Sequence, residues 1–401
     1  MQPGIFEGLK VIDCASFIAA PAAATVLSDF GAEVIKIEPP GTGDPYRHLP
    51  KMPGQPVCDL NYAWMLESRN KKSLALDLSK PDGQAVLRRL IAETDVFITN
   101  FPPNVRQRLR ISYDDLGPLN DRLVYASFTG YGEFGEEADK PGFDSNAWWA
   151  RSGLMDLVRP DPHGGPARST PGMGDHPSAT AVFASIVTAL YQRERTGKGA
   201  YVGSSLIANG IWSNAFFAQA KLCGATIADR PKREDAVNAL SNHYRCRDER
   251  WLILSLLNED RQWPTVLKCL EREDLQDDPR FAEKAQRHAN ARALIPILDE
   301  IFAGKDLAEW RQILDGNGLT FGIVAIMDDI PHDAQMLKNG VLVPFEGEST
   351  LTISSPFWVK DAVKQTPRLP PDLGEHSDEI LRQAGYSVAE IGALRGKGVV
   401  A

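Results

Sequence analysis

Short apolar runs alternate with helical segments along the first third of the chain. Runs with the length and composition of buried strands occupy residues 10–13, 32–38, 72–78, 95–99 and 123–128. Between them lie small helix formers around residues 22–27 and a helical apolar spacing at residues 82–93. Strands that alternate with helices predict parallel β-α-β units and a doubly wound α/β sheet, which binds ligands at the carboxyl ends of its strands.

Beyond the first third of the chain, the alternation of short apolar runs and helices gives way to longer predicted helices. Residues 178–195 (SATAVFASIVTALYQRER) are predicted to form a long helix that ends at Gly197 after a basic last turn. Residues 202–222 are predicted to form a second helix. Charge and proline gather at residues 229–242, and residues 251–317 have the mixed composition of a compact unit. We therefore predict two domains: a large Rossmann-like domain, residues 1–225 completed by the tail 330–401, and a smaller α+β domain, residues 226–329.

Composition and charge narrow the class of protein. The chain has 401 residues, of which 43% are hydrophobic and 24% charged, as in a soluble globular protein of two domains. Its 44 Lys and Arg against 53 Asp and Glu leave a net charge of −9, and no block of basic residues occurs. A negative surface repels phosphate backbones and anionic lipids, and no apolar run approaches the ~18 residues of a membrane span. We expect neither nucleic acid nor a membrane as a partner.

Cysteine and histidine usage excludes several kinds of site. The five cysteines are odd in number and form no C-x-x-C pair, which argues against a disulfide framework or zinc ribbon and favours a reducing, cytoplasmic location. The seven histidines show no metal-ligand spacing, so no metal site is predicted. The sequence also lacks the G-x-S-x-G elbow of many hydrolases and the lysine-containing P-loop of NTPases.

One glycine-rich segment has the pattern of a dinucleotide-binding site. Residues 130–135 (GYGEFG) match G-x-G-x-x-G and follow a predicted strand. The next residues, 136–142 (EEADKPG), should open a helix, but they contain two adjacent acids, Pro141 and Gly142. These would repel a pyrophosphate and break the helix, so we interpret the segment as a turn.

Asp175 is the strongest candidate for chemistry. The segment PGMGDHPS at residues 171–178 places it directly before the long helix, a position typical of helix capping. The same position suits a covalent nucleophile, because the positive helix end would keep the carboxylate ionised and free N–H groups would stabilise an oxyanion. Gly172 and Gly174 would let the backbone pass close to a ligand. The residues themselves leave both roles open.

Two loops follow predicted strands and reach the expected ligand-binding edge. The segment NFPPNVRQR at residues 100–108 carries Arg106 and Arg108, and a guanidinium there suits a phosphate group. Solvation of both side chains is the alternative. The segment PPGTGDPYR at residues 39–47 is placed similarly.

Taken in order, these stretches resemble the class III coenzyme A (CoA) transferases, the family of formyl-CoA, carnitine and bile-acid CoA-transferases. The matching stretches run from residue 8 to residue 381: GLKVID with FIAAPAAA, GAEVIKIEPPGTGDPYR, NKKSLALDL, TNFPPNVRQRL, FTGYGEFG, KPGFD, GMGDH and LGEHSDEIL. The combination of GFD, GDH and NKK is most similar to transferases of phenyllactate and other 2-hydroxy acids.

The resemblance implies a fold, a reaction and a partner. Two chains would interlock, as a homodimer or alternatively a heteromer, and Asp175 falls on the family's catalytic aspartate. Its carboxylate would attack an acyl-CoA to form an aspartyl-acyl anhydride, and the CoA thiolate would return to give an aspartyl-CoA thioester. A free carboxylic acid, of the 2-hydroxy, aryl or dicarboxylic kind, would then take the CoA. The CoA thioester is the substrate, and no permanently bound cofactor or metal is implied.

The resemblance also implies the CoA-binding residues. They lie on loops after predicted strands and in the GFD stretch: Ile18, Ala19, Leu76, Asp77, Leu78, Ser79, Asn100, Phe101, Pro102, Arg108, Gly142, Phe143 and Asp144. Arg108 would meet a phosphate of CoA.

The sequence differs from the family pattern at two places, and these differences argue against two activities of the family. The glycine run that closes over oxalate in formyl-CoA transferases has no counterpart at residues 238–244 (NALSNHY), which argues against an oxalate-specific enzyme. Phe143 replaces the histidine that family racemases of 2-methylacyl-CoA use as a second proton carrier. A racemase or isomerase, and a noncatalytic subunit of a heteromeric transferase, are the alternative functions. Asn242 and His243 are candidates for contact with the acceptor acid, with surface placement as the alternative.

Overall fold

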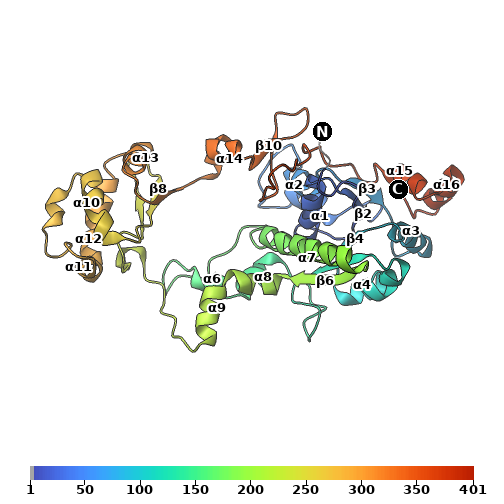
Figure 1. The fold of residues 1–401 in the computed structure, drawn as a ribbon, viewed down its shortest axis with the longest axis horizontal. Helices are drawn as coiled ribbons and strands as arrows, with labels where there is room; N and C mark the ends of the chain where they lie inside the picture. Colours follow the sequence, from blue (N-terminus) through green and yellow to red (C-terminus); the bar gives the residue numbers. More distant parts are fainter. Residues whose placement is uncertain (1–3) are drawn as a thin grey trace. The chain divides into compact units, whose positions relative to one another are not determined.

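Two compact units make up the chain in a computed structural model that describes residues 4–401 (Figure 1). The first unit contains residues 4–155, Arg168–Ala225 and Ala334–Ala401, and the second contains Asp156–Ala167 and Thr226–Asp333. Residues 156–167, which the sequence assigned to the large domain, group with the smaller unit. Their sequence is rich in proline and glycine and has no apolar period that would reveal where they pack.

The first unit is built on a six-stranded sheet in which all neighbouring strands run parallel. Its strands are β1 (Lys10–Asp13), β2 (Glu33–Glu38), β3 (Lys72–Ala75), β4 (Val96–Thr99), β5 (Val124–Thr129) and β6 (Ala200–Ser205). Their order is β3-β2-β1-β4-β5-β6, so the direction of winding reverses between β1 and β4. The predicted α/β class with a parallel sheet is confirmed, and the reversal marks the edge where such sheets bind ligands.

Helices cover both faces of this sheet. On one face α1 (Ala19–Asp29) and α7 (Asp175–Thr196) pack side by side (Figure 1). On the other face, strand residues such as Ile12 and Phe97 form a buried cluster with four further helices. These are α3 (Pro81–Ile91), α5 (Tyr113–Leu116), α15 (Ser377–Gln383) and α16 (Val388–Gly396).

Shorter elements complete the chain around this sheet. They are η1 (Pro45–Lys51), α2 (Tyr62–Ser68), α4 (Pro103–Leu109), η2 (Gly117–Leu119), η3 (Asp144–Ala150), α6 (Leu154–Leu157), α8 (Leu206–Ser213), α9 (Ala215–Leu222), α14 (Ala334–Lys338), β10 (Leu342–Pro344) and β11 (Leu351–Ile353). Within residues 4–401, no helix has both the length and the apolar character needed to cross a membrane.

One of the two predicted long helices is confirmed, and the other is wrong over its first residues. Helix α7 is present, and it ends at Gly197, whose φ of +73° provides the expected left-handed stop. The second helix, predicted over residues 202–222, is wrong at its start, because residues 200–205 form β6 and two short helices follow. Gly203 pairs there with Ser127 of β5, and a Cβ at this glycine would lie 2.9 Å from the Ser127 hydroxyl. This close pairing, which local sequence does not reveal, outweighs the apparent helical pattern.

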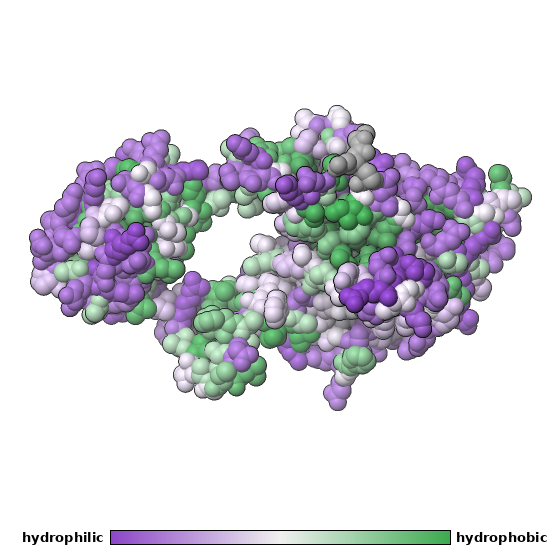
Figure 2. Space-filling view, in the orientation of Figure 1, coloured by the Kyte–Doolittle hydropathy of each residue, from purple (hydrophilic) through white to green (hydrophobic). Residues whose placement is uncertain are grey.

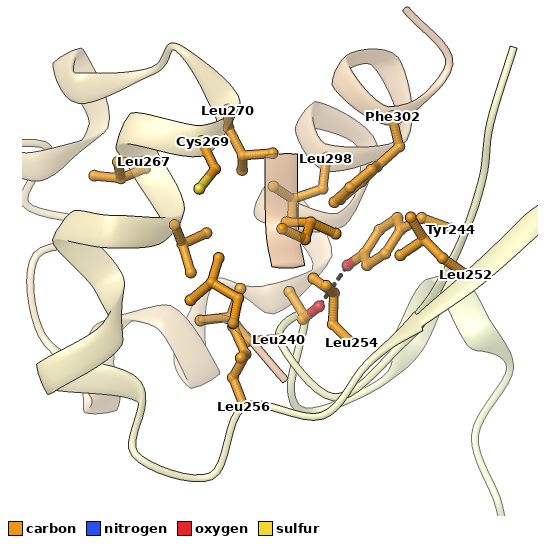
Figure 3. Close-up of a cluster of buried hydrophobic side chains, with 14 of the residues drawn as sticks. Leu240, Tyr244, Leu252, Leu254, Leu256, Leu267, Cys269, Leu270, Leu298 and Phe302 are labelled. Carbon is orange, nitrogen blue, oxygen red and sulfur yellow. Dashed lines mark hydrogen bonds between the residues drawn. The ribbon is translucent and has the colours of Figure 1, made fainter. Parts of the chain in front are cut away.

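The second unit has a hydrophobic core of its own (Figure 3). Its antiparallel sheet has the order β7-β8-β9, with strands His243–Arg245, Trp251–Leu254 and Phe321–Val324. Its helices are α10 (Glu259–Leu270), α11 (Lys284–Ala289), α12 (Ala291–Phe302) and α13 (Leu307–Gly316), with short turns η4 (Arg233–Asp235), η5 (Glu273–Gln276) and η6 (Met327–His332). The buried Tyr244 stacks on Phe302 and donates its hydroxyl to the Ala239 carbonyl at 2.6 Å.

A network of buried charges lies at the carboxyl ends of β1 and β2. Lys36 in the middle of β2 places its Nζ 2.9 Å from Asp44 Oδ2 and 3.6 Å from Asp13 Oδ1. Lys71 Nζ approaches Asp13 Oδ2 at 2.8 Å. All four side chains are at most 2% exposed. Although burial opposes ionisation of Asp13, the two lysines hold its pKa below the usual value, so the network is charged.

Removing one charge from this network is expected to destabilise the first unit. Lys36→Met leaves Asp44 without its ion-pair partner and weakens the pairing of Asp13, which costs about 3–5 kcal/mol of unfolding free energy. Urea denaturation measures the change. Lys72→Met is the matched control, since Lys72 lies in β3 but pairs at the surface with Glu33 and Glu379, and its loss should cost about 1 kcal/mol or less. Equal losses in the two variants would contradict this account.

Candidate active site

A cavity of about 360 Å³ in the first unit collects many of the predicted site residues. It lies at the carboxyl edge of the sheet, near the β1/β4 reversal, and Asp175 contributes to its lining. The predicted CoA-binding residues that line it are Ile18, Ala19, Asn100, Gly142, Phe143 and Asp144. A cavity of about 420 Å³ beside Phe30 and Trp358 contains none of the predicted site residues.

Asn100 ties together the two loops at the reversal point. Its Nδ2 donates to the carbonyl of Ser16 at 2.7 Å, and its Oδ1 accepts the N–H of Ser16 at 2.9 Å. Ser16 follows β1 and Asn100 follows β4, so the side chain bridges the strands between which the winding reverses. This fixes the positions of Phe17 and Ile18 at the cavity.

Asp175 is the first residue of α7, and Gly174 is the N-cap. The Asp175 carboxylate is half-buried and forms no hydrogen bond with any group in residues 4–401. The N-cap Gly174 supplies no side-chain cap, and its own N–H is accepted by Asp144 Oδ2 at 3.2 Å. Asp175 is therefore available for chemistry, and the interpretation of it as a helix cap is wrong.

The ionisation of Asp175 differs from the sequence-based expectation. Burial and the negative charge of Asp144 raise the pKa of Asp175 to about 7, while the charge of His176 opposes the rise. The helix end therefore does not keep the carboxylate fully ionised at neutral pH. A carboxylate with a raised pKa is a stronger base and nucleophile once it is ionised.

His176 does not line the cavity and contacts the turn before α7. Its Nε2 lies 2.7 Å from Glu67 Oε1, and its Nδ1 donates to the Gly172 carbonyl at 3.0 Å. Although burial opposes its charge, the hydrogen bond and negative charge of Glu67 raise the pKa of His176 to about 9. At neutral pH His176 is thus an imidazolium that positions the turn and lowers the pKa of its neighbour Asp175.

The two glycines of the turn have different roles. Gly172 lines the cavity with a φ of +79°, and a Cβ there would lie 2.9 Å from the His176 ring. Gly174 makes room for a protein side chain and not for a ligand, because a Cβ there would lie 2.6 Å from the Trp148 ring. Within residues 4–401, the N–H groups of Gly172 and Asp175 have no hydrogen-bond partner, so both remain available as donors.

Other predicted residues lie outside this cavity. Leu76, Asp77, Leu78 and Ser79 follow β3, where Leu76 forms a bridge with Val400 of the C-terminal segment. Phe101 and Pro102 lead from β4 into α4. Because the strands are parallel, these segments share the carboxyl edge of the sheet with the cavity.

The two arginines of α4 are distinguished by their partners. Arg106 is buried and pairs with Glu133 at 2.6 Å and with the Tyr201 hydroxyl at 3.0 Å. Arg108 is exposed and forms no ion pair or hydrogen bond with residues 4–401, which leaves its guanidinium open to a ligand.

Asn242 and His243 lie in the second unit. Asn242 is buried and donates to the carbonyl of Arg233 at 3.1 Å, so its surface placement is wrong. His243 is exposed and lies against Trp251, with ring centroids 5.4 Å apart. No group of three or more His, Cys, Asp or Glu in the described part of the chain could hold a metal ion.

The chain is similar to known proteins over most of its length. A sequence model of CoA-transferase family III matches residues 6–377. The chain is 31% identical to (R)-2-hydroxy-4-methylpentanoate CoA-transferase of Clostridioides difficile, over 99% of both chains. It is 31% identical to cinnamoyl-CoA:phenyllactate CoA-transferase of Clostridium sporogenes, over 97% of this chain and 96% of that protein. A solved structure, a CAIB/BAIF family protein from Brucella suis, superposes with a TM-score of 0.85 at 28% identity, over 96% of this chain and 100% of that chain.

Neutralising Asp144 is expected to lower the pKa of Asp175. In Asp144→Asn the amide oxygen can still accept the Gly174 N–H, while the negative charge that raises the pKa is gone. The titration midpoint of Asp175 should fall below about 7, as followed by ¹³C NMR of labelled aspartate carboxyls and assigned with Asp175→Asn. Asp114→Asn, an exposed change in α5, should leave the midpoint in place. An unchanged or higher midpoint in Asp144→Asn would contradict this electrostatic account.

Proposed function

Since the chain belongs to CoA-transferase family III, we propose that it moves CoA from an acyl-CoA donor to a free carboxylic acid with Asp175 as the covalent nucleophile. The observation that carries the proposal is the environment of the Asp175 carboxylate. It is half-buried, has no hydrogen-bond partner within residues 4–401, and lines a cavity at the reversal point of the sheet. A nucleophile needs this combination of access and partial desolvation.

The first half of the reaction loads CoA onto Asp175. A carboxylate oxygen of Asp175 attacks the thioester carbonyl, the C–S bond breaks, and CoA leaves as a thiolate, which gives an aspartyl-acyl anhydride. The thiolate then attacks Cγ of Asp175, and the C–O bond to the bridging oxygen breaks. The products are an aspartyl-CoA thioester and the free donor carboxylate.

The second half transfers CoA to the acceptor. The acceptor carboxylate attacks Cγ of the aspartyl-CoA thioester, which forms a new anhydride and expels the thiolate. The thiolate attacks the carbonyl of the acceptor acyl group, and Asp175 leaves as a carboxylate. Each step passes through an oxyanion, for which the unpaired N–H groups of Gly172 and Asp175 are suitable donors.

We propose that CoA lies along the carboxyl edge of the sheet. Ile18, Ala19 and Asn100 would contact the arm near Asp175, together with residues 142–144. Residues 76–79, with Phe101 and Pro102, would border the rest of the molecule. Arg108 would contact a phosphate, since it is the arginine of α4 without a protein partner.

The alternative functions have less support at this cavity. A racemase needs two proton carriers on opposite sides of the substrate, and Phe143 occupies the position of the family's second carrier. A noncatalytic subunit has no need for an unpaired carboxylate in a cavity. We therefore propose a catalytic chain that works on a CoA thioester without a resident cofactor.

We also propose that two copies of the chain associate as an interlocked homodimer. Exposed apolar side chains gather on α8 and α9, where Trp212 and Phe216 are each 81% exposed and Leu222 is 82% exposed (Figure 2). An apolar surface of this kind is typical of protein interfaces. A cytoplasmic location, where acyl-CoA thioesters and reduced cysteines coexist, fits the proposed reaction.

Borohydride trapping tests the nucleophile. Treatment with an acyl-CoA followed by borohydride should reduce the activated Asp175 carbonyl to an alcohol, which peptide mass spectrometry locates. The modification should require acyl-CoA and be absent in Asp175→Asn. Asp144→Asn, which keeps the nucleophile, should still be modified. Modification at another residue, or none while CoA binds, would contradict the proposal.

Arg108 is expected to affect CoA recognition selectively. Arg108→Gln removes a charge-assisted hydrogen bond to phosphate, and KM for the acyl-CoA should rise about tenfold while KM for the acceptor acid stays constant. Arg110→Gln serves as the control, because Arg110 is also exposed but terminates α4. Steady-state kinetics with both substrates measure the effect, and equal changes in the two variants would exclude a specific role for Arg108.

A further inference from the structure

A buried glutamate lies beside the first turn of α7. Glu67 is on α2, and its side chain is 2% exposed. Its backbone carbonyl accepts the hydroxyl of Thr25 on α1, and its Oε1 lies 2.7 Å from His176 Nε2 on α7. Glu67 therefore joins α2 to both helices that pack together on this face of the sheet. It lies outside the stretches that carry the family resemblance.

The contacts of His176 assign a proton to each of its ring nitrogens. Nδ1 lies 3.0 Å from the Gly172 carbonyl oxygen, and Nε2 faces the Glu67 carboxylate. A carbonyl and a carboxylate both accept hydrogen bonds, so both nitrogens must donate, which only an imidazolium can do. The geometry therefore gives His176 a positive charge. Its pKa of about 9 agrees, because the hydrogen bond and charge of Glu67 outweigh the opposing effect of burial.

The same contacts hold the turn that carries Asp175. The Gly172 carbonyl accepts the backbone N–H of His176 at 3.1 Å as well as the Nδ1–H of the ring. A Cβ at Gly172 would lie 2.9 Å from this ring, so the ring packs directly on the backbone of the turn. Asp175 lies between these two residues in the chain, and its position therefore depends on them.

Charged and titratable side chains from four elements act on Asp175. Burial and the negative charge of Asp144 on η3 raise its pKa, the positive charge of His176 on α7 lowers it, and the charge of Glu67 has the smallest effect, a rise. Tyr46 on η1 is buried, and burial together with the charges of Glu67 and Asp175 raises its pKa, so its hydroxyl stays neutral. His176 is therefore the group that offsets Asp144.

Lys71 is a second cation that the charge of Glu67 affects. Burial lowers the pKa of Lys71, while the charges of Asp13 and Glu67 oppose this effect. Lys71 already has a carboxylate partner, because its Nζ lies 2.8 Å from Asp13 Oδ2. Glu67 is hydrogen-bonded to His176 and not to Lys71, so we expect a change at Glu67 to act chiefly on His176.

We propose that Glu67 and His176 form a positioning pair that keeps the Asp175 carboxylate ionised for its attack on the thioester. The inference rests on the proposed function, because Asp175 must be the nucleophile. Glu67 keeps the proton on His176, and the imidazolium offsets the negative charge of Asp144. Both residues act through Asp175, and neither lines the cavity. Without the pair, Asp175 ionises only at higher pH, and the transfer of CoA requires that higher pH.

The pH profile of Glu67→Gln tests the pair in the full-length protein. The amide keeps the size of the side chain but removes its charge, so His176 becomes neutral near pH 7 and the cation beside Asp175 is lost. The rise of kcat/KM with pH should then have a midpoint about one unit higher than in the unmodified protein. This shift lowers kcat/KM about tenfold more at pH 6 than at pH 9. A loss of equal size at every pH would indicate a merely structural role and overturn the inference.

His176→Gln removes the cation directly and keeps the negative charge of Glu67. Because that charge raises the pKa of Asp175, the midpoint in this variant should rise at least as far as in Glu67→Gln. The two variants together keep the test decisive if one of them does not fold. An unchanged or lower midpoint in either folded variant would overturn the inference.

A second buried Glu–His pair provides the matched control. Glu259 in the second unit is 2% exposed, and its Oε1 lies 2.9 Å from His288 Nε2. Glu259→Gln breaks the same kind of pair, and the midpoint of kcat/KM should equal that of the unmodified protein. Thermal melting shows that each variant is folded. A shift as large as that of Glu67→Gln would mean that the effect is not specific to Asp175, which would overturn the inference.

NMR tests the pair without turnover and separates it from the proposed function. In ¹⁵N spectra of labelled histidines, assigned with His176→Gln, both ring nitrogens of His176 should be protonated at pH 7.5, and Glu67→Gln should abolish this state. A neutral His176 in the unmodified protein would overturn the inference and leave the proposed function standing. If His176 is charged but no acyl-CoA yields an adduct at Asp175, the proposed function itself fails, and the inference fails with it.

Discussion

The buried ion pairs of Lys36 join the loops at the edge of the sheet where the candidate active site lies. Lys36 lies in β2, yet it contacts Asp13 at the end of β1 and Asp44 in the loop after β2. Asp44 in turn accepts the N–H of Phe17, and so links the network to the cavity wall. Burying these charges is costly unless each has a partner, so the network favours the loop arrangement that brings the four side chains together. The positions of the loops at the cavity therefore depend on buried ion pairs that do not themselves line it.

Much of the fold follows from the spacing of apolar residues. The family assignment follows from motifs spread over the chain, and the match of the CoA-transferase family III model to residues 6–377 confirms it. The alternation of runs and helices predicted five of the strands. The sixth, β6, was missed because its close pairing with β5 depends on small residues such as Gly203, a long-range contact that local sequence does not reveal.

Placement of the site residues was only partly predictable. Sequence reasoning selected Asp175 and Asn100, and both line the cavity. It missed two contacts that hold the turn before α7, His176 with Glu67 and the Gly174 N–H with Asp144. One signal was present, since Lys36 stands between isoleucines in a buried strand and requires buried acids nearby. The raised pKa of Asp175 had no such signal, because it arises from burial and a like charge brought close only by folding.

If Asp175 reacts covalently as proposed, one oxygen atom of the acceptor acid must end in the Asp175 carboxylate. When the acceptor carboxylate attacks the aspartyl-CoA thioester, the bridging oxygen comes from the acceptor and stays with Asp175 when the second anhydride is cleaved. A single turnover with an ¹⁸O-labelled acceptor should therefore leave one ¹⁸O atom in the peptide that contains Asp175, detected by mass spectrometry. If the label appears only in the acyl-CoA and the free acids, CoA is transferred without an aspartyl intermediate, and the account is contradicted.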